Sequence, residues 1–246
     1  MIASAKIVIV AALEREVWPL VKNWPVSRRQ QDLRWFKFFE KDGVALVCGG
    51  IGPEAARRAA EAAVSIYHPQ LLISAGFAGA LSPKLSIGQT FTPQHVVDAG
   101  DGSRIASVFG DGVLVSSPDI ADVEQKIRLG NAYGADAVDM EAAAVARCAA
   151  AHDIRFLACK VISDNNSTSL PPIARFVGSD GCFHAVSFVG FVLIRPWLWG
   201  QVLKLARDSS TAAARLCETL GDSGIRALGD VEVNPSVHAD SEGVLR

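Results

Sequence analysis

The sequence has few cysteines for its length, and they do not form a recognisable pattern. Only five of the 246 residues are cysteine, and they show neither CxxC pairs nor metal-type spacing with histidine. A disulfide framework or a cysteine-rich metal module is therefore not expected. An odd number of buried, reduced thiols is typical of a cytoplasmic protein, which is the localisation we predict.

An excess of charge of one sign is also missing. The chain has 24 Lys and Arg against 26 Asp and Glu, which gives a formal net charge of −2, and the basic residues are scattered. A nucleic-acid-binding protein would be expected to carry a basic patch or stripe. The composition therefore argues against a nucleic-acid partner.

Long apolar runs are absent as well. No run reaches the roughly 20 residues that span a bilayer. Residues 7–13 could pass for the core of a signal peptide, but Glu14-Arg15-Glu16 follows at once, without a small-residue cleavage site. We expect this segment to be the first buried strand.

The residues that are present favour one α/β domain. Half of the chain is hydrophobic and 20% is charged, which suffices for a full core in a chain of this length. Apolar runs, glycines and amphipathic stretches alternate, which predicts a single-domain, mixed, largely parallel twisted sheet flanked by helices. The expected strands are 7–10, 44–48, 71–75, 89–98, 113–115 and 156–162, with a short segment at 105–109. The expected helices are 14–24, 53–67, 120–128, 141–152 and 201–220.

The end of the chain differs in character. Residues 221–246 have little apolar content, so we expect a domain over 1–220 and a flexible C-terminal tail over 221–246. Residues 183–199 are strongly apolar and rich in Phe and Trp. We favour a core or subunit interface for this stretch, and with it a homo-oligomer. The alternative is a peripheral membrane contact or an apolar surface that binds substrate. Trp beside a basic residue suits a bilayer interface.

Three carboxylates lie at the ends of expected elements. Asp164 follows the strand at 156–162, Glu141 begins a helix, and Glu16 lies in the first turn of another helix. In open α/β sheets ligands bind beyond the carboxyl ends of the strands. These carboxylates, together with Gly50 and Gly76, are therefore expected to converge on one site.

The motifs that contain these residues resemble a known family. Val138-Asp139-Met140-Glu141-Ala142 and Ile162-Ser163-Asp164, read with the N-terminal Ala12-Leu13-Glu14-Arg15-Glu16-Val17, resemble the nucleoside phosphorylase and nucleosidase superfamily. Within it, the methylthioadenosine/S-adenosylhomocysteine nucleosidase branch is the most similar. The segment around 195–209 also resembles the C-terminus of hopanoid-associated phosphorylases.

The resemblance implies a role for each carboxylate. Asp164, preceded by Ser163, would protonate or hydrogen-bond purine N7; a helix N-cap is the alternative. Glu141 would accept hydrogen bonds from the ribose hydroxyls, with Met140 packed against the sugar. Glu16 would hold the attacking water. For both glutamates, a favourable interaction with a helix N-terminus is the alternative, and Glu14 competes with Glu16.

One departure from the family bears on the nucleophile. Phe77 occupies the position of a phosphate-contacting Ser in the purine phosphorylases, and Ser74 that of an Arg. This loss of phosphate anchors favours water, although another Arg could substitute. Asp139 and Lys160 are expected to form a structural ion pair.

The resemblance thus implies an enzyme that releases adenine hydrolytically from a 5′-substituted adenosine, its small-molecule partner. It implies no metal or organic cofactor, with phosphate as an alternative co-substrate. One alternative is a phosphorylase or nucleosidase acting on adenosylhopane. Another, of a different class, is a non-catalytic nucleoside-binding protein.

Overall fold

The computed structural model describes residues 5–31, 33–168, 173–176, 178, 181, 183–184, 187–188, 191–192 and 195–221. The predicted tail lies outside these residues, apart from Gly221. Only part of the apolar stretch 183–199 lies within them. In the described part of the chain, no helix is both long and apolar enough to cross a membrane.

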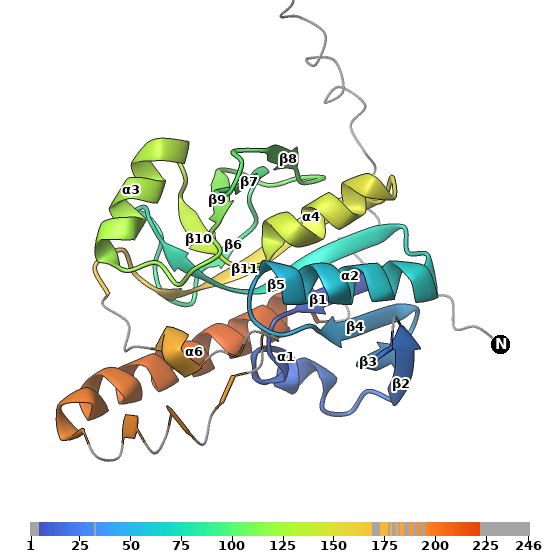
Figure 1. The fold of residues 1–246 in the computed structure, drawn as a ribbon, viewed down its shortest axis with the longest axis horizontal. Coiled ribbons are helices and arrows are strands. Elements are labelled where there is room, and N and C mark those ends of the chain that lie inside the picture. Colours follow the sequence, from blue (N-terminus) through green and yellow to red (C-terminus); the bar gives the residue numbers. More distant parts are fainter. Residues whose placement is uncertain are drawn as a thin grey trace, which may run out of the picture.

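The described residues form a mixed sheet of 11 strands flanked by helices, which confirms the predicted fold class (Figure 1). The strands are β1 (Ile7–Ala11), β2 (Val26–Gln31), β3 (Arg34–Lys41), β4 (Val44–Cys48), β5 (Leu71–Ala80), β6 (Thr90–Phe91), β7 (His95–Asp98), β8 (Arg104–Ala106), β9 (Val113–Ser116), β10 (Ala137–Asp139) and β11 (Arg155–Asp164). The helices are α1 (Glu14–Val21), α2 (Pro53–Tyr67), α3 (Val123–Tyr133), α4 (Ala142–Ala151) and α6 (Trp199–Thr219), with short 3-10 turns at Ile173–Phe176 and Pro196–Leu198.

The centre of the sheet is parallel. β1 pairs in parallel with β4 and β5, and β11 pairs in parallel with β5. β10 joins the far half of β5 in the antiparallel sense and continues the sheet through β9, β7 and β8. The carboxyl ends of β1, β4 and β11 therefore face one edge, where a site is expected.

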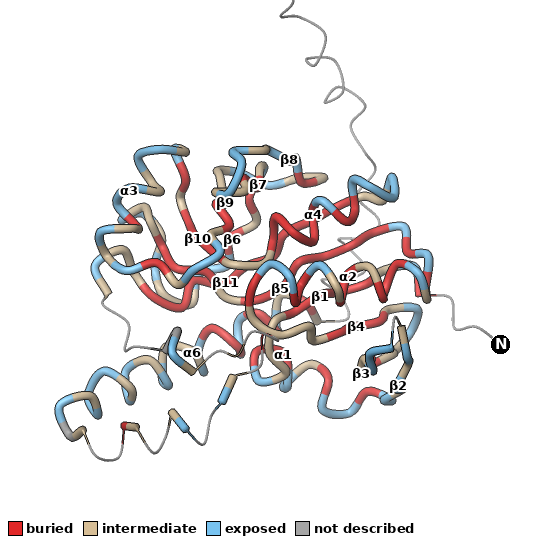
Figure 2. Tube along the Cα trace, in the orientation of Figure 1, coloured by how far each residue is buried: buried red, intermediate tan, exposed pale blue. Residues whose placement is uncertain are grey.

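Helices cover both faces of this centre. α2 and α4 pack on one face, where their alanines meet Val8, Leu72 and Ala158. α1 and α6 pack on the other face against Ile9 and Ile73. Figure 2 shows the central strands as buried, together with the helix sides that face them. Alternate strand residues thus serve two cores, which explains why these strands are continuously apolar.

Several boundaries differ from those predicted. β5 does not end before Gly76 but continues to Ala80, because it pairs with β11 as far as Gly79 and with β10 at Gly79 and Ala80. The predicted strand 89–98 is two strands, β6 and β7, and Pro93 lies between them, where its missing N–H cannot join a ladder. α3 begins at Val123, three residues later than predicted, because Asp122 and Gln125 form a capping box.

Candidate active site

A cavity of about 710 Å³ opens at the predicted edge of the sheet. It is lined by the loop after β1, the start of α1, the middle of β5, the ends of β10 and β11, residues around the start of α3, and one side of α6. Predicted site residues from separate parts of the chain meet here: Glu16, Phe77, Met140, Glu141, Ser163 and Asp164 all line the cavity.

Two predicted residues, Gly50 and Gly76, do not line the cavity. Gly50 has φ = 107°, and a Cβ there would lie 3.0 Å from the carbonyl oxygen of Gly181. A Cβ on Gly76 would lie 3.1 Å from Oε2 of Glu16. Gly50 is thus a steric requirement of the turn, and Gly76 makes room for a site carboxylate.

Glu16 is buried in the first turn of α1, with 6% of its surface exposed. Its Oε2 has no hydrogen-bond partner among the described residues. Burial, followed by repulsion from Glu141, raises the pKa of Glu16 to about 8. The competing Glu14 instead forms an ion pair with Lys37 at 2.9 Å on the surface. Of the two glutamates, Glu16 is the one with a free oxygen at the cavity.

Glu141 occupies the N-cap position of α4, where its side chain reaches across to α2. Its Oε1 accepts a hydrogen bond of 2.8 Å from the backbone N–H of Gly52. Gly52 has φ = 96°, a left-handed conformation that favours glycine. Burial, followed by repulsion from Asp139, raises the pKa of Glu141 to about 7. The side chain does not cap its own helix, contrary to the alternative interpretation.

Asp139 and Lys160 form the ion pair that the sequence predicts, at 2.8 Å and fully buried. Asp139 also accepts hydrogen bonds from the Ser116 hydroxyl at 2.5 Å and from the Ala142 N–H at 2.9 Å. Burial opposes the charge of Lys160, but Asp139 and Glu141 raise its pKa above the ordinary value. Lys160 donates a hydrogen bond of 3.0 Å to Ser74, so Ser74 belongs to this network.

Asp164 is the last residue of β11 and not a helix N-cap; the chain continues into a turn at Asn166. The pairing of β11 with β5 shifts register between Ile162 and Asp164. Such a bulge re-aims side chains that would otherwise alternate between the two faces. Ser163 and Asp164 both line the cavity as a result, and the Ser163 hydroxyl donates to Oδ1 of Asp164 at 2.8 Å.

Lys126 is a residue of the site that the sequence motifs do not predict. It is 2% exposed, its ammonium forms an ion pair with Oδ2 of Asp164, and it donates to the Asn165 carbonyl at 2.8 Å. Gly79 provides the space, because a Cβ there would lie 3.0 Å from Asp164 Oδ2 and 3.3 Å from Lys126 Cε. The capping box that sets the start of α3 is the only local signal for the orientation of Lys126.

Among the described residues, the remaining walls supply Arg15 as a cation and a large apolar surface. Arg15 lines the cavity, as do Trp18 and Phe188. Val202 and Leu205 of α6 complete the apolar side. Phe188 packs against Phe183 and Phe176, with ring centroids 5.5 and 5.4 Å apart. Part of the apolar stretch 183–199 therefore forms a wall of the cavity.

This fold is the fold of known nucleosidases. The 5′-methylthioadenosine nucleosidase of Arabidopsis thaliana superimposes with a TM-score of 0.69 at 18% identity, covering 92% of this chain and 97% of that one. The S-adenosylhomocysteine nucleosidase of Streptococcus pyogenes gives 0.65 at 18%, covering 88% and 94%. The futalosine hydrolase of Helicobacter pylori gives 0.61 at 19%, covering 85% and 94%.

The sequence identifies the family independently of these structures. The model of the phosphorylase superfamily matches residues 6–122 and 104–171. No curated protein sequence gives a significant match. The chain belongs to the phosphorylase superfamily and is an enzyme that acts on nucleosides.

Proposed function

We propose that the enzyme hydrolyses the N-glycosidic bond of a purine nucleoside and releases adenine from a 5′-substituted adenosine. The observation that carries this proposal is the meeting of Glu16, Glu141 and Asp164 in one cavity. Breaking such a bond develops positive charge on the ribose and negative charge on the base. The site therefore needs an acid, a grip on the sugar and a positioned nucleophile.

The base would lie against Asp164. Its carboxyl group is held on one side by the Ser163 hydroxyl and on the other by the Lys126 ammonium. These contacts fix the orientation of the Asp164 side chain, so it is already placed to contact purine N7 when the substrate binds. When Asp164 gives its proton to N7, it becomes a carboxylate. Lys126 would act as a positioning residue whose ammonium stabilises that carboxylate.

The sugar would lie between Glu141 and Glu16. Glu141 keeps Oε1 on the Gly52 N–H, and its carboxylate would accept hydrogen bonds from the ribose hydroxyls. A carboxylate beside an oxocarbenium-like ring stabilises the positive charge that develops there. Met140 lines the same part of the cavity and supplies apolar contact for the ring.

Water is the proposed nucleophile, held by the free Oε2 of Glu16. Phe77 lines the cavity without a donor, and Ser74, which accepts a hydrogen bond from Lys160, does not line it, so neither provides a phosphate anchor. Arg15 is the described guanidinium at the cavity that could serve phosphate instead. A direct comparison of turnover with and without phosphate is therefore part of the test.

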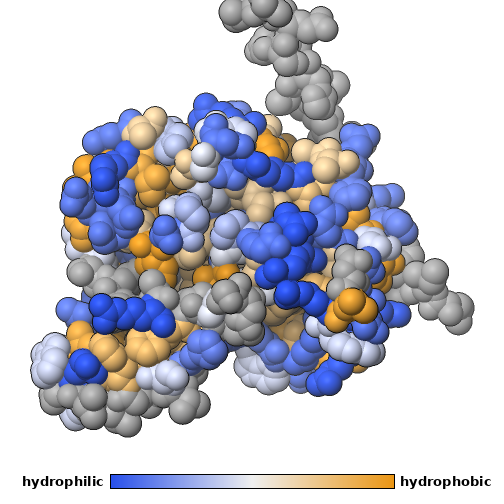
Figure 3. Space-filling model, viewed as in Figure 1, coloured by the Kyte–Doolittle hydropathy of each residue, from blue (hydrophilic) through white to orange (hydrophobic). Residues whose placement is uncertain are grey.

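The apolar wall supports a second candidate substrate, an adenosine joined through its 5′ carbon to a polycyclic lipid. Val202, Leu205 and Phe188 line the cavity beyond the carboxylates. Leu203 is 63% exposed and Trp199 47% exposed on the same helix. In Figure 3 apolar surface is visible on the lobe that α6 forms. A lipid-linked 5′ group would find apolar contact there that a free hydroxyl cannot use.

The test is adenine release from methylthioadenosine, S-adenosylhomocysteine, adenosine and an adenosyl-lipid, each with and without phosphate. We expect release from at least one 5′-substituted substrate without phosphate. If ligands bind but no base is released under any condition, the protein is the non-catalytic nucleoside-binding alternative. Release that occurs only with phosphate would establish a phosphorylase.

A further inference from the structure

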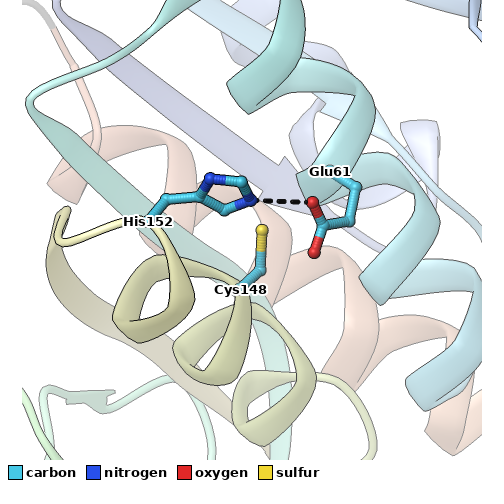
Figure 4. A group of neighbouring side chains, drawn as sticks. All are labelled: Glu61, Cys148 and His152. Carbon is cyan, nitrogen blue, oxygen red and sulfur yellow. Dashed lines mark hydrogen bonds and ion pairs between the residues drawn. The ribbon is translucent and has the colours of Figure 1, made fainter.

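Three side chains of the kinds that bind transition metals meet away from the cavity. Glu61 belongs to α2, Cys148 to α4, and His152 to the C-cap of α4. Their ligand atoms all lie within 4.8 Å of one another. Figure 4 shows the three side chains pointing toward one another from the two helices. None of the three lines the cavity.

The spacing along the chain explains two of the three positions. Cys148 and His152 are four residues apart at the end of one helix, so their side chains project from the same side of α4. Glu61 comes from the neighbouring helix, and its Oε2 lies 2.9 Å from Nε2 of His152. The sequence predicts no metal site because its cysteines form no CxxC pair, and the packing of α2 on α4 brings in the third ligand.

The burial of the three groups suits a site that is open on one side. The Cys148 side chain is buried, while the His152 and Glu61 side chains are 43% and 39% exposed. A metal ion could enter from solvent and keep a water molecule as a further ligand. The exposed His and Glu side chains can adjust to ligand distances of about 2.0–2.2 Å around a thiolate at about 2.3 Å.

We propose that Glu61, Cys148 and His152 form a binding site for a zinc-like divalent transition metal that joins α2 to α4. Thiolate, imidazole and carboxylate together favour zinc over magnesium or calcium, which prefer oxygen ligands alone. Binding replaces the thiol proton with the metal ion, and the proton passes to solvent. The guanidinium of Arg57 interacts electrostatically with both Glu61 and Cys148. It offsets part of the negative charge of the carboxylate and the thiolate.

A bound metal would stabilise the contact between α2 and α4, the two helices that position Glu141. α4 begins at this residue, and Gly52, at the start of α2, donates to its carboxylate. Metal at the other end of the α2–α4 contact would therefore stabilise the pair without touching substrate. The expected effect of zinc is a higher unfolding temperature for the whole chain, since a ligand that binds only the folded state stabilises it.

Cobalt(II) is the probe for the ligand set, because a cobalt–thiolate bond gives an intense near-ultraviolet charge-transfer band. We expect the full chain to develop this band and saturate at one equivalent of cobalt. Cys148→Ala should lose the band, whereas Glu61→Gln and His152→Gln should weaken binding at least about tenfold. Glu54→Gln, a carboxylate on the same helix that pairs with Arg57 and Arg58, is the matched control and should bind as the parent does.

Thermal unfolding with zinc gives the second readout. Zinc should raise the unfolding temperature of the parent and of Glu54→Gln, and at the same concentration it should raise that of His152→Gln by less. His152 is exposed, so this variant is expected to fold even if the buried Cys148→Ala does not. Absence of the cobalt band in the parent, or a cobalt affinity and a zinc shift in His152→Gln that equal those of the parent, would overturn the proposal.

Discussion

Two neighbouring glutamates of the cavity, Glu16 and Glu141, have raised pKa values. Glu16 is buried and Glu141 is half-buried, and ionisation of one makes ionisation of the other harder. Lys160 partly offsets this repulsion. Such carboxylates titrate close to neutral pH, where ordinary glutamates do not, and this property is common at catalytic sites.

The first prediction follows from these pKa values. If Glu16 activates water, its working form is the carboxylate, so kcat/KM should rise with pH until about pH 8. Initial rates from pH 5 to 9 test this directly. Glu16→Gln should lower kcat by about two to four orders of magnitude and abolish the rise. A flat profile, or one that falls from pH 6 to 8, would assign Glu16 another role.

The second prediction concerns the acid. Asp164→Asn should lower kcat by roughly 10²–10⁴-fold without loss of fold. Lys126→Met should also lower kcat, by roughly 10–10²-fold, with a smaller change in KM, because Asp164 loses its positioning partner. Lys126→Arg should recover part of the activity by keeping the charge. If Lys126→Met turns over like the parent, the ion pair is structural only.

At the scale of elements, α4 depends on a buried polar network. The hydrogen bond from the Ala142 N–H to Asp139 satisfies one of the free donors of the first turn. The carboxylate also neutralises Lys160, which is 1% exposed. The start of α4, and with it the position of Glu141, therefore rests on charge pairing inside the core.

The third prediction is that Asp139→Asn destabilises the protein by about 3–5 kcal/mol, because it leaves a buried ammonium without its partner. Denaturant unfolding at neutral pH measures the effect. Arg147→Gln, on α4, is a suitable control, since the ion pairs of Arg147 with Asp98 and Asp101 lie at the surface. That change should cost within about 1 kcal/mol. Equal costs for the two variants would show that the buried network does not support α4.

Most central elements could be predicted because they leave a local pattern. β1 and β4 are apolar runs, and α2 begins at Pro53 after a glycine. The β2–β3 hairpin was not predicted, because segments such as Val26–Gln31 are largely polar. β10 has only three residues and gives too short a pattern. Lys126 was missed because only tertiary packing turns it inward.

At the scale of the whole molecule, α6 decides the size of the site. It comes from the end of the chain, packs on α1, and closes the apolar side of the cavity. The motifs between 7 and 164 predict the carboxylates but contain no information about this wall. The homo-oligomer, the membrane contact and the flexible tail stay predictions.

The fourth prediction uses this wall. In a series of 5′-alkylthio adenosines, kcat/KM should increase by up to about fourfold for each added methylene that α6 can bury, which corresponds to about 0.8 kcal/mol. Leu205→Asp should flatten the series, while Gln201→Asp, at an exposed position of the same helix outside the cavity lining, is the matched control. Equal efficiency along the series in the parent would show that the wall does not contact the 5′ group.

The most direct measurement follows the new bond at C1 of the sugar. A 5′-substituted adenosine that the enzyme turns over is incubated in ¹⁸O-labelled water without phosphate, and both products are analysed by mass spectrometry. Hydrolysis in the carboxylate cavity predicts free adenine and a sugar that carries ¹⁸O at C1, with both formed at least about 10²-fold more slowly by Asp164→Asn. A sugar 1-phosphate that appears only when phosphate is supplied, with no labelled sugar, would contradict it.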